Sequence, residues 1–476
     1  MKKDFPFFIS GEEQTSDEQL EVRNPFNNEI IGITYRPTAK DVEKAIASSI
    51  RAFEKTKYLP SYARSNILQI AAEEIEKRKD ELAKILCLES GKPIRHALGE
   101  VTRAVSTLTI ASEEAKHIEG EVLSMDITPA AGDRLGIVRR FPIGPIVGIS
   151  PFNFPLNLVC HKVAPALASG NTITIKPASA TPLSALCLGE ILHKAGAIPG
   201  SINVLPCSAK STEPLVYDPR LKMITFTGSA DVGWHIKSRA GKKRVCLELG
   251  GNAAVVVEPD ADMKYAVERS ILGGFAYAGQ ICISVQRIFI HEKIYDSFRS
   301  DLISGVEKLI LGDPLSEKTD VGPMIDESAL IKTEEWIKEA INKGAELLTG
   351  GKRKDTLFEP TVLENVNRKA KVACEEVFAP VVVLDKYKTV DEAINLVNNS
   401  KFGLQAGIFT HDIEKAFYAF NHIDVGGVII NDIPTYRVDH MPYGGVKNSG
   451  FGREGVKYAI EEMTELKIMV VNHGLT

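Results

Sequence analysis

From residue 145 onward, short apolar segments rich in β-branched residues alternate with segments of helical length. PIVGI (145–149), NTITIK (171–176) and MITFT (223–227) have the composition of buried strands. LVCHKVAPALA (158–168) and LSALCLGEILHKAG (183–196), which lie between them, have apolar residues at helical spacing. Strands that alternate with helices of this length form βαβ units, in which the strands lie parallel. The pattern therefore predicts an α/β fold with a mostly parallel sheet.

The alternation continues in two blocks that a pair of glycines separates. INVLP (202–206) and RVCLEL (244–249) are expected to be further strands of the first block. A second alternating block runs from AAVVVEP (253–259) to GGVIIND (426–432), and Gly250-Gly251 lies between the two. Because 476 residues are too many for one hydrophobic core, two or three domains are expected.

Before residue 145 the pattern is different. Segments 41–57 and 61–90 are rich in Ala, Glu, Lys and Ile at helical spacing, and they predict two helices, of which Gly91 and Pro93 end the second. The segment 125–142 breaks the helical pattern and is expected to be extended.

The composition argues against several classes of function. The chain is 44% hydrophobic and 25% charged, and its formal net charge of −5 gives no support to a nucleic-acid partner. No apolar run approaches the roughly 20 residues of a membrane helix. The N-terminus lacks the apolar core of a signal peptide, so we expect a cytoplasmic protein. The seven cysteines have no CxxC spacing and the ten histidines form no HExxH motif, so neither disulfides nor a metal are expected.

Two glycine-rich motifs differ in their position relative to the predicted strands and helices. In FTGSADVG (226–233) a predicted strand runs directly into a predicted helix, so Gly228 and Gly233 would let a phosphate approach backbone N–H groups at the helix N-terminus. A simple strand-to-helix turn would look the same. GFGREG (450–455) matches GxGxxG, but it follows no strand and precedes only 21 residues, so we interpret it as a turn.

Glu248 and Lys176 each end a predicted strand, at the edge of an open α/β sheet where ligands bind. A solvated side chain at a strand end would give the same pattern.

Seven motifs occur in order along the chain. They are FNFPLN (152–157), TIKPAS (174–179), FTGSADVG (226–233), LELGGN (247–252), AGQICIS (278–284), EEVFAPV (375–381) and MPYGGVKNSGFGREG (441–455). Together they resemble the aldehyde dehydrogenase superfamily over nearly the whole chain.

The resemblance implies the aldehyde dehydrogenase fold, which combines a Rossmann-like NAD(P)-binding domain, an α/β catalytic domain and a small β extension that builds homodimers or homotetramers. Mapped onto this chain, the domains are 1–124 with 143–250 for the cofactor, 251–447 for catalysis, and 125–142 with 448–476 for oligomerisation.

The resemblance also implies the catalytic residues. Cys282 corresponds to the nucleophile that attacks the aldehyde carbon, and Asn153 to the donor that stabilises the oxyanion together with the Cys282 backbone N–H. Glu248 corresponds to the base that activates water to hydrolyse the thioester.

The residues that the resemblance assigns to the cofactor are Ser150, Pro151, Phe152, Lys176, Ser179, Gly228, Ser229, Gly233, Leu249, Glu376 and Phe378. Ser179 is a departure, because many relatives have a glutamate there that would repel a 2′-phosphate. With serine in its place Lys176 can pair with that phosphate, so we expect NADP to be accepted alongside NAD. The alternative is that Ser179 simply hydrogen-bonds NAD.

Other residues fall where relatives line the aldehyde tunnel, namely Arg103, His161, Ile281, Ile283, Arg437 and Tyr443. A guanidinium binds carboxylate or phosphate in a bidentate manner, so Arg103 and Arg437 favour an anionic substrate. The alternative is that Arg437 makes a subunit contact and that Arg103 pairs with Glu100.

RVDHMPYGGVK together with NLVCHK resembles the lactaldehyde, glyceraldehyde and phosphonoacetaldehyde branch of the superfamily. The expected substrate is therefore a short anionic or hydroxy aldehyde. An enzyme that passes the acyl group to coenzyme A and a non-catalytic member are the rival interpretations. The presence of Glu248 speaks against the first, and that of Cys282, Asn153 and Glu248 together speaks against the second.

Overall fold

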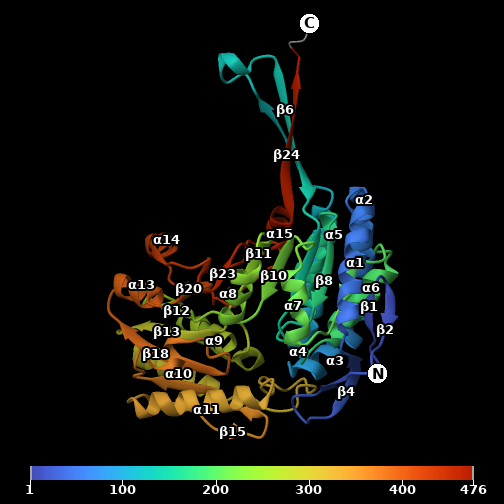
Figure 1. Ribbon diagram of the computed structural model, residues 1–476. Helices are drawn as coiled ribbons and strands as arrows, with labels where there is room; N and C mark the ends of the chain where they lie inside the picture. Colours follow the sequence, from blue (N-terminus) through green and yellow to red (C-terminus); the bar gives the residue numbers. More distant parts are fainter. Residues whose placement is uncertain (1–2, 474–476) are drawn as a thin grey trace.

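Two open sheets, one from each half of the chain, form the frame of the molecule (Figure 1). The computed structural model describes residues 3–473. In spatial order the first sheet contains β2 (Glu12–Gln14), β1 (Phe7–Ile9), β9 (Ile202–Val204), β8 (Thr172–Lys176), β7 (Pro145–Ile149), β10 (Met223–Thr227), β11 (Arg244–Glu248) and β23 (Gly450–Phe451). The five strands from β9 to β11 in this order are parallel, which confirms the prediction from the alternating pattern.

The second sheet is built in the same way. In spatial order it contains β14 (Glu346–Thr349), β17 (Thr361–Glu364), β18 (Val381–Tyr387), β13 (Val285–His291), β12 (Ala253–Val257), β20 (Gln405–Phe409) and β21 (Gly427–Ile430). All neighbouring pairs except β14–β17 are parallel. Gly250-Gly251 lies between β11 of the first sheet and β12 of the second, where the chain crosses from one body to the other.

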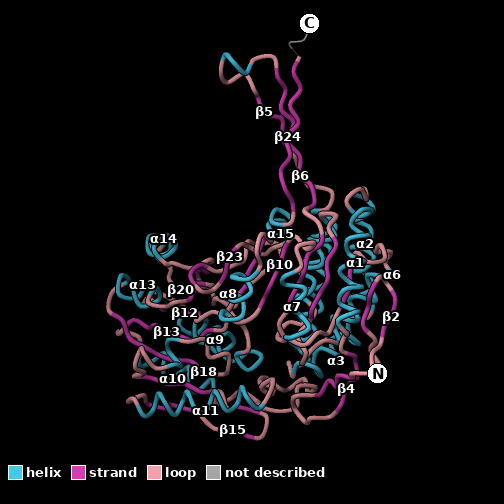
Figure 2. The backbone as a smooth tube through the Cα atoms, viewed as in Figure 1, coloured by secondary structure: helices cyan, strands magenta, loops and turns pink. Residues whose placement is uncertain are grey.

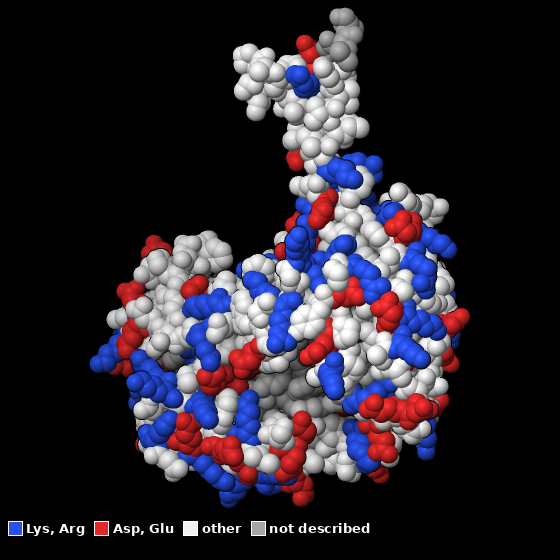
Figure 3. Space-filling model, viewed as in Figure 1, with Lys and Arg blue, Asp and Glu red and all other residues white. Residues whose placement is uncertain are grey.

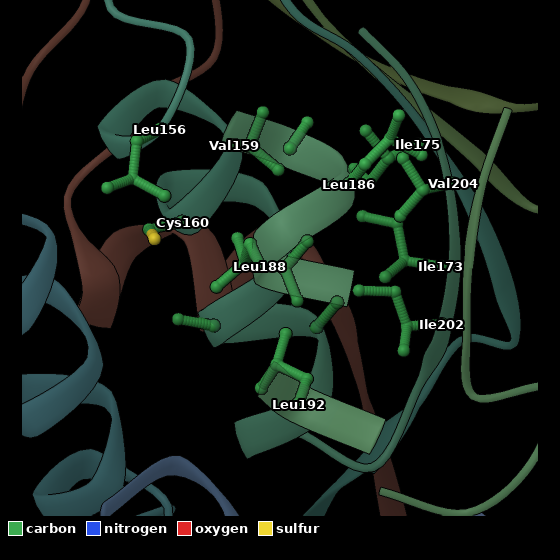
Figure 4. Packing of buried hydrophobic residues seen from close by; sticks show 14 of the residues in the cluster. Leu156, Val159, Cys160, Ile173, Ile175, Leu186, Leu188, Leu192, Ile202 and Val204 are labelled. Atoms are coloured by element: carbon green, nitrogen blue, oxygen red, sulfur yellow. The ribbon is translucent and has the colours of Figure 1, made fainter. Parts of the chain in front are cut away.

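Helices cover the first sheet. They are α1 (Ala39–Thr56), α2 (Ser61–Lys77), α3 (Lys79–Ser90), α4 (Ile94–Glu114), α5 (Asn157–Ala168), α6 (Leu183–Lys194), α7 (Ala209–Tyr217), α8 (Ala230–Arg239) and α15 (Val456–Glu462). Leu186 and Leu188 of α6 belong to the same buried cluster as Ile173 of β8 and Val204 of β9 (Figure 4). These β- and γ-branched apolar side chains fill the layer between helices and sheet.

The predicted helix at 61–90 is wrong in one respect, because the segment forms two helices. The backbone leaves the helical region at Arg78, which has φ −98° and ψ 19°, and α3 begins at the next residue. The apolar spacing is helical on both sides, with Leu68 and Ile75 buried in α2 and Leu82 in α3. No Gly or Pro marks the break, so periodicity alone cannot reveal it.

The helices around the second sheet are α9 (Met263–Phe275), α10 (Tyr295–Val306), α11 (Glu327–Asn342), α12 (Lys371–Cys374), α13 (Val390–Asn398) and α14 (Ile413–His422). The sequence predicts a helix over 262–278, and α9 is shorter than that at its C-terminal end. It ends at Phe275, and η2 (Ala276–Gly279) follows with Tyr277, Ala278 and Gly279 at φ values of 50°, 53° and 68°. Consecutive left-handed residues are costly. They turn the chain sharply just before Cys282.

A narrow β extension projects from the body of the molecule (Figure 2). Its strand order is β24 (Thr464–Asn472), β6 (Arg134–Pro142) and β5 (Glu121–Ser124), and η1 (Pro129–Ala131) lies between β5 and β6. The predicted boundaries at 125 and 448 differ from this arrangement. β5 already belongs to the extension, whereas 448–463 lies on the first body, where β23 pairs with β11 and α15 packs on α5. These pairings join distant segments and have no local signature.

Three short two-stranded sheets complete the fold. They are β3 (Gln19–Arg23) with β4 (Ile30–Tyr35), β15 (Arg353–Lys354) with β16 (Leu357–Phe358), and β19 (Phe402–Gly403) with β22 (Val446–Lys447). Between residues 3 and 473, no helix has the length and apolar character needed to cross a membrane.

Candidate active site

Cys282 lies on the loop that leaves the left-handed turn of η2. Its Sγ is 3.0 Å from Oη of Tyr443, and a small apolar cluster of Ile283, Leu404 and Tyr443 packs around it. A Cβ on Gly251 would lie 2.3 Å from the Cys282 carbonyl oxygen, so only glycine lets the loop approach the crossover between the two bodies this closely. The crossover and the Cys282 loop are thereby held against each other.

A cavity of about 60 Å³ lies at this point. The predicted catalytic and substrate residues that line it are Arg103, Glu248, Ile281, Cys282, Ile283, Arg437 and Tyr443. Phe154, Asn157 and Thr435 also line it and were not predicted. The structure thus brings the proposed nucleophile and base together although they belong to different bodies.

Glu248 ends β11 and is almost fully buried. Neither carboxylate oxygen has a hydrogen-bond partner among the described residues. Burial, followed by the charge of Glu454, raises the pKa of Glu248 well above its usual value, and Arg437 and Lys162 oppose the shift. A buried carboxyl with free oxygens and a raised pKa has the properties of a general base that binds water.

A second buried carboxylate, Glu454, lies next to this base. Nζ of Lys162 donates to Oε1 of Glu454 at 2.9 Å and to Oγ1 of Thr227 at 2.6 Å. Burial opposes the ionisation of Glu454, but Lys162 and Arg437 outweigh it and lower the pKa to about 2. The negative charge of this cluster therefore resides on Glu454, and Glu248 is the carboxyl that titrates.

Sequence reasoning missed both members of this pair. Lys162 lies in the largely apolar helix α5, and a lysine on a buried helix face was the available signal. Glu454 belongs to GFGREG, which was interpreted only as a turn. That interpretation is wrong in part, because Gly450 and Phe451 form β23, which pairs with β11. The rest of the motif is a loop that leads into α15, and a Cβ on Gly455 would lie 2.2 Å from the Met441 carbonyl oxygen.

Burial raises the pKa of the Cys282 thiol to about 11, while the hydrogen bond with Tyr443 and the charge of Arg437 act in the opposite direction. All seven cysteines lie within the described residues and are free.

Asn153 lies beside the Cys282 loop rather than in the cavity wall. Its Nδ2 donates to the carbonyl oxygen of Gln280 at 2.9 Å, and its buried Oδ1 has no partner among residues 3–473. Its role as oxyanion donor stays a prediction.

Arg103 does not pair with Glu100, so that alternative is wrong. Its Nη2 donates to Oδ1 of Asp439 at 2.7 Å. Glu100 instead pairs with the buried Lys92 and accepts hydrogen bonds from the backbone N–H groups of Leu156 and Asn157 at 3.0 and 3.1 Å. Arg103 is therefore held at the cavity by a residue from the far end of the chain.

Asp439 also holds His161, which lies outside the cavity lining. Burial and the charge of Arg437 lower the pKa of His161, so the ring is neutral. Burial opposes the ionisation of Asp439, but the hydrogen bond from His161 and the charge of Arg103 lower its pKa well below the usual range. A carboxylate only accepts, so Nε2–H of His161 donates to Oδ1 of Asp439 at 2.9 Å. His161 thus helps to hold Asp439 in the position from which it binds Arg103.

Arg437 is buried inside the chain, with 6% of its side chain exposed. This burial speaks against the alternative that its side chain makes a subunit contact. Its Nη2 lies 3.3 Å from Oε2 of Glu454 and its guanidinium 3.6 Å from the centre of the Tyr443 ring, while its Nε has no partner among the described residues. A buried donor without a partner is a site for an acceptor on a ligand.

A second cavity of about 620 Å³ opens at the carboxyl edge of the first sheet. Ser150, Lys176 and Ser179, all predicted, line it together with Lys210 and Arg239, which were not predicted. The buried Oγ of Ser150 has no partner among residues 3–473. The size, the unpartnered hydroxyl and a lining of three cations with one carboxylate, Glu213, fit a nicotinamide dinucleotide.

The predicted phosphate turn lies between β10 and α8. Gly228 and Ser229 separate the strand from the helix, as FTGSADVG predicted, and Ser229 is the N-cap of α8. A Cβ on Gly233 would lie 2.3 Å from Cδ2 of Leu249. Gly233 therefore lets the helix pack closely on the chain that follows β11.

Glu376 and Phe378 reach the crossover from the second body. Oε1 of Glu376 accepts a hydrogen bond from the Gly251 N–H at 3.0 Å, and burial raises the pKa of Glu376 to about 7. The rings of Phe378 and Phe152 meet edge to face at 5.8 Å, and Phe378 has a φ of 56°. Pro151 directly precedes Phe152 at the end of β7. These residues join the two bodies beside the dinucleotide cavity.

No group of three or more His, Cys, Asp or Glu side chains within residues 3–473 is arranged to hold a metal ion.

Comparison with known proteins gives a consistent result. The model of the aldehyde dehydrogenase family matches residues 12–469. The 3-sulfolactaldehyde dehydrogenase of Priestia aryabhattai is 46% identical, with 99% of this chain and 98% of that protein covered. The lactaldehyde dehydrogenase of Methanococcus aeolicus is 39% identical over 98% of this chain and 99% of its own.

Two solved structures are similar over nearly the whole chain. Aldehyde dehydrogenase 21 from Physcomitrella patens, in complex with the reaction product succinate, has a TM-score of 0.98 and 47% identity, and both chains are covered completely. The glyceraldehyde-3-phosphate dehydrogenase GapN of Methanocaldococcus jannaschii, complexed with NADP, has a TM-score of 0.92 and 41% identity over 96% of this chain and 100% of that one. Together with the geometry around Cys282 and Glu248, these matches show that the chain belongs to the aldehyde dehydrogenase family.

Proposed function

We propose that this enzyme oxidises a short anionic aldehyde to its carboxylic acid with NADP or NAD. The observation that carries the proposal is the pair of guanidinium groups, from Arg103 and Arg437, in the wall of the small cavity that also contains Cys282 and Glu248. An anion opposite the reacting carbonyl would satisfy the unpartnered Nε of Arg437.

The similar proteins support this substrate class. Sulfolactaldehyde, glyceraldehyde 3-phosphate and succinate, which the names of three of them mention, each carry an anionic group away from the oxidised carbon. The cavity at Cys282 is small, about 60 Å³, which favours a short aldehyde. We therefore infer a short aldehyde with a terminal carboxylate, sulfonate or phosphate, with a hydroxyl tolerated.

The residues of the chain act on the substrate in two stages. The Cys282 sulfur bonds to the aldehyde carbon and afterwards holds the acyl group as a thioester, while Asn153 and the Cys282 backbone N–H stabilise the oxyanion. When bound, the nicotinamide cofactor is the hydride acceptor. Glu248 then takes a proton from a water molecule that attacks the thioester, and Glu454 and Lys162 retain their charges behind it.

Variants of the two arginines test the substrate class. Arg103→Leu should lower kcat/KM at least tenfold for an anionic aldehyde such as succinic semialdehyde, but much less for neutral lactaldehyde. Arg437→Leu should lower kcat/KM for both aldehydes, because Arg437 also acts on Cys282, but the loss should be larger for the anionic one. Arg95→Leu is the matched control, because Arg95 lies on the same helix as Arg103 and pairs with Asp320 at the surface. Equal losses on both aldehydes would refute an anion-binding role.

The cationic side chains in the second cavity support NADP as a cofactor. Lys176, Lys210 and Arg239 line the dinucleotide cavity with Ser179. Ser179→Glu should lower kcat/KM for NADP at least tenfold and leave that for NAD within about threefold, because a carboxylate would repel the 2′-phosphate. A native kcat/KM that is far lower for NADP than for NAD would refute the assignment.

Hydrolysis, rather than transfer to coenzyme A, is supported by the free oxygens of Glu248. Addition of coenzyme A should therefore leave the rate of cofactor reduction unchanged, and the product should be the free acid. Formation of an acyl-coenzyme A would favour the acylating alternative, and the absence of turnover on every aldehyde would favour the non-catalytic one.

We also infer that the β extension joins copies of the chain into a homodimer or homotetramer. β24 is an edge strand that exposes Leu466, Ile468, Met469 and Val470, and few charges lie on the outer part of the extension on the face that Figure 3 shows. The double variant Leu466→Asp/Met469→Asp should be monomeric by light scattering, whereas Ile70→Asp on α2 should not change the assembly. A native chain that is monomeric at micromolar concentration would contradict this inference.

A further inference from the structure

We propose that Tyr443 is a catalytic residue whose hydroxyl donates a hydrogen bond to the Cys282 sulfur and stabilises the attacking thiolate. Oη of Tyr443 lies 3.0 Å from Sγ of Cys282, within hydrogen-bond distance for sulfur. The inference rests on the proposed function only in that it takes Cys282 as the nucleophile. It assigns Tyr443 a role toward the enzyme's own reacting atom instead of toward the substrate.

The backbone of Tyr443 is held on both sides. Its N–H donates to the Glu454 carbonyl oxygen at 3.0 Å, and the Glu454 N–H donates to the Tyr443 carbonyl oxygen at 2.7 Å. The side chain is 3% exposed and packs with Ile283 and Leu404. Because the ring cannot turn to solvent, the hydroxyl is fixed on the sulfur before any substrate arrives.

A cation strengthens this donor. The guanidinium of Arg437 lies 3.6 Å from the centre of the Tyr443 ring, and a cation over the face of the ring withdraws electron density from the hydroxyl. Burial raises the pKa of Tyr443 well above its usual value, so the hydroxyl remains protonated and able to donate.

The Cys282 thiol requires a hydrogen-bond donor of this kind to ionise. Burial raises the pKa of Cys282 to about 11, and the hydrogen bond from Tyr443 is the largest influence that lowers it. A phenylalanine at this position would fill the same space without donating. The hydroxyl is therefore the part of the side chain that bears on the chemistry.

Alkylation of Cys282 by iodoacetamide tests the proposal without aldehyde or cofactor. Loss of the hydroxyl in Tyr443→Phe should raise the pKa of the thiol by about one to two pH units. A thiolate of higher pKa is also more nucleophilic, with a Brønsted coefficient of about 0.4–0.5, so the net alkylation rate at pH 7.5 should fall about threefold for each unit. The rise of the rate with pH should continue to a higher pH than in the native enzyme.

Peptide mass spectrometry would confirm that Cys282 is the residue alkylated, with Cys282→Ser as the blank. Tyr436→Phe is the matched control, because Tyr436 lies in the same loop with its side chain largely exposed. A residue that only packed against the sulfur would, when altered, leave the thiol equally or more accessible. An alkylation rate in Tyr443→Phe equal to or above the native rate, with the thermal midpoint unchanged, overturns the proposal.

Destabilisation of Tyr443→Phe, seen as a lower thermal midpoint, cannot by itself produce the expected slower alkylation, because loosened packing speeds alkylation whereas loss of the donor slows it. If alkylation follows the expected course but no short anionic aldehyde is oxidised, the proposed substrate is wrong and the role of Tyr443 stands.

Discussion

Substitution of Gly250 by alanine tests the predicted role of Glu376 in holding the cofactor. A Cβ at this position would lie 2.2 Å from Oε2 of Glu376, where an ordinary contact begins at 3.4 Å. The carboxylate must therefore retreat by about 1 Å, and a misplacement of that size costs up to about a hundredfold in rate. The retreat also breaks the hydrogen bond that the Gly251 N–H donates to Oε1 at 3.0 Å.

From these contacts we expect Gly250→Ala to lower kcat/KM for NADP by about 10- to 100-fold, while KM for the aldehyde changes little. The free energy of unfolding should fall by about 1–3 kcal/mol, as is usual for an overpacked site. Initial rates at varied NADP, together with quenching of protein fluorescence by NADP, would separate binding from turnover.

The matched control is Gly99→Ala on α4. No atom lies within 4 Å of a Cβ at Gly99, so alanine there should be neutral or stabilising by up to about 1 kcal/mol. A double-mutant cycle with Glu376→Ala shows whether the effect passes through Glu376. If Gly250→Ala binds NADP as well as the native enzyme, or if its loss adds fully to that of Glu376→Ala, the reasoning is wrong.

Three further predictions concern the buried carboxyl groups. Because burial raises the pKa of Glu248, hydrolysis should speed up as pH rises and the group loses its proton. Glu248→Gln should lose at least a hundredfold in steady-state turnover but keep a first-turnover burst of reduced cofactor in stopped flow. Loss of that burst would contradict the role of Glu248 in hydrolysis alone. Glu454→Gln leaves Lys162 buried without its carboxylate and should cost about 3–5 kcal/mol in urea unfolding, whereas a loss below 1 kcal/mol would show that the pair is dispensable. Burial raises the pKa of Glu376 from 4.5 to about 7, so its contribution to stability is present below pH 4.5 and is lost as pH rises through 7. Glu376→Gln should therefore show a smaller fall in thermal midpoint between pH 5 and 7.5 than the native enzyme. Parallel curves of thermal midpoint against pH would speak against this raised pKa.

The sequence alone predicted the parts of this protein that depend on neighbours along the chain. Alternation of apolar strands and helices predicted the parallel strands β7 to β11, because the period of burial is a local property. Ordered motifs predicted that Cys282 and Glu248 act together, and the structure places both in the wall of one cavity. The predicted arginines lie there as well.

Only the tertiary structure decided which charged groups meet in the interior. Lys162 and Glu454 are 292 residues apart in the chain, and His161 and Asp439 are 278 apart. Ion pairs of this kind form because desolvation penalises any buried charge that lacks a partner, and the fold determines which partner lies within reach. No local pattern in the sequence records that distance, so the cluster behind Glu248, the support of Arg103 and the contact of Tyr443 with Cys282 became visible only in three dimensions.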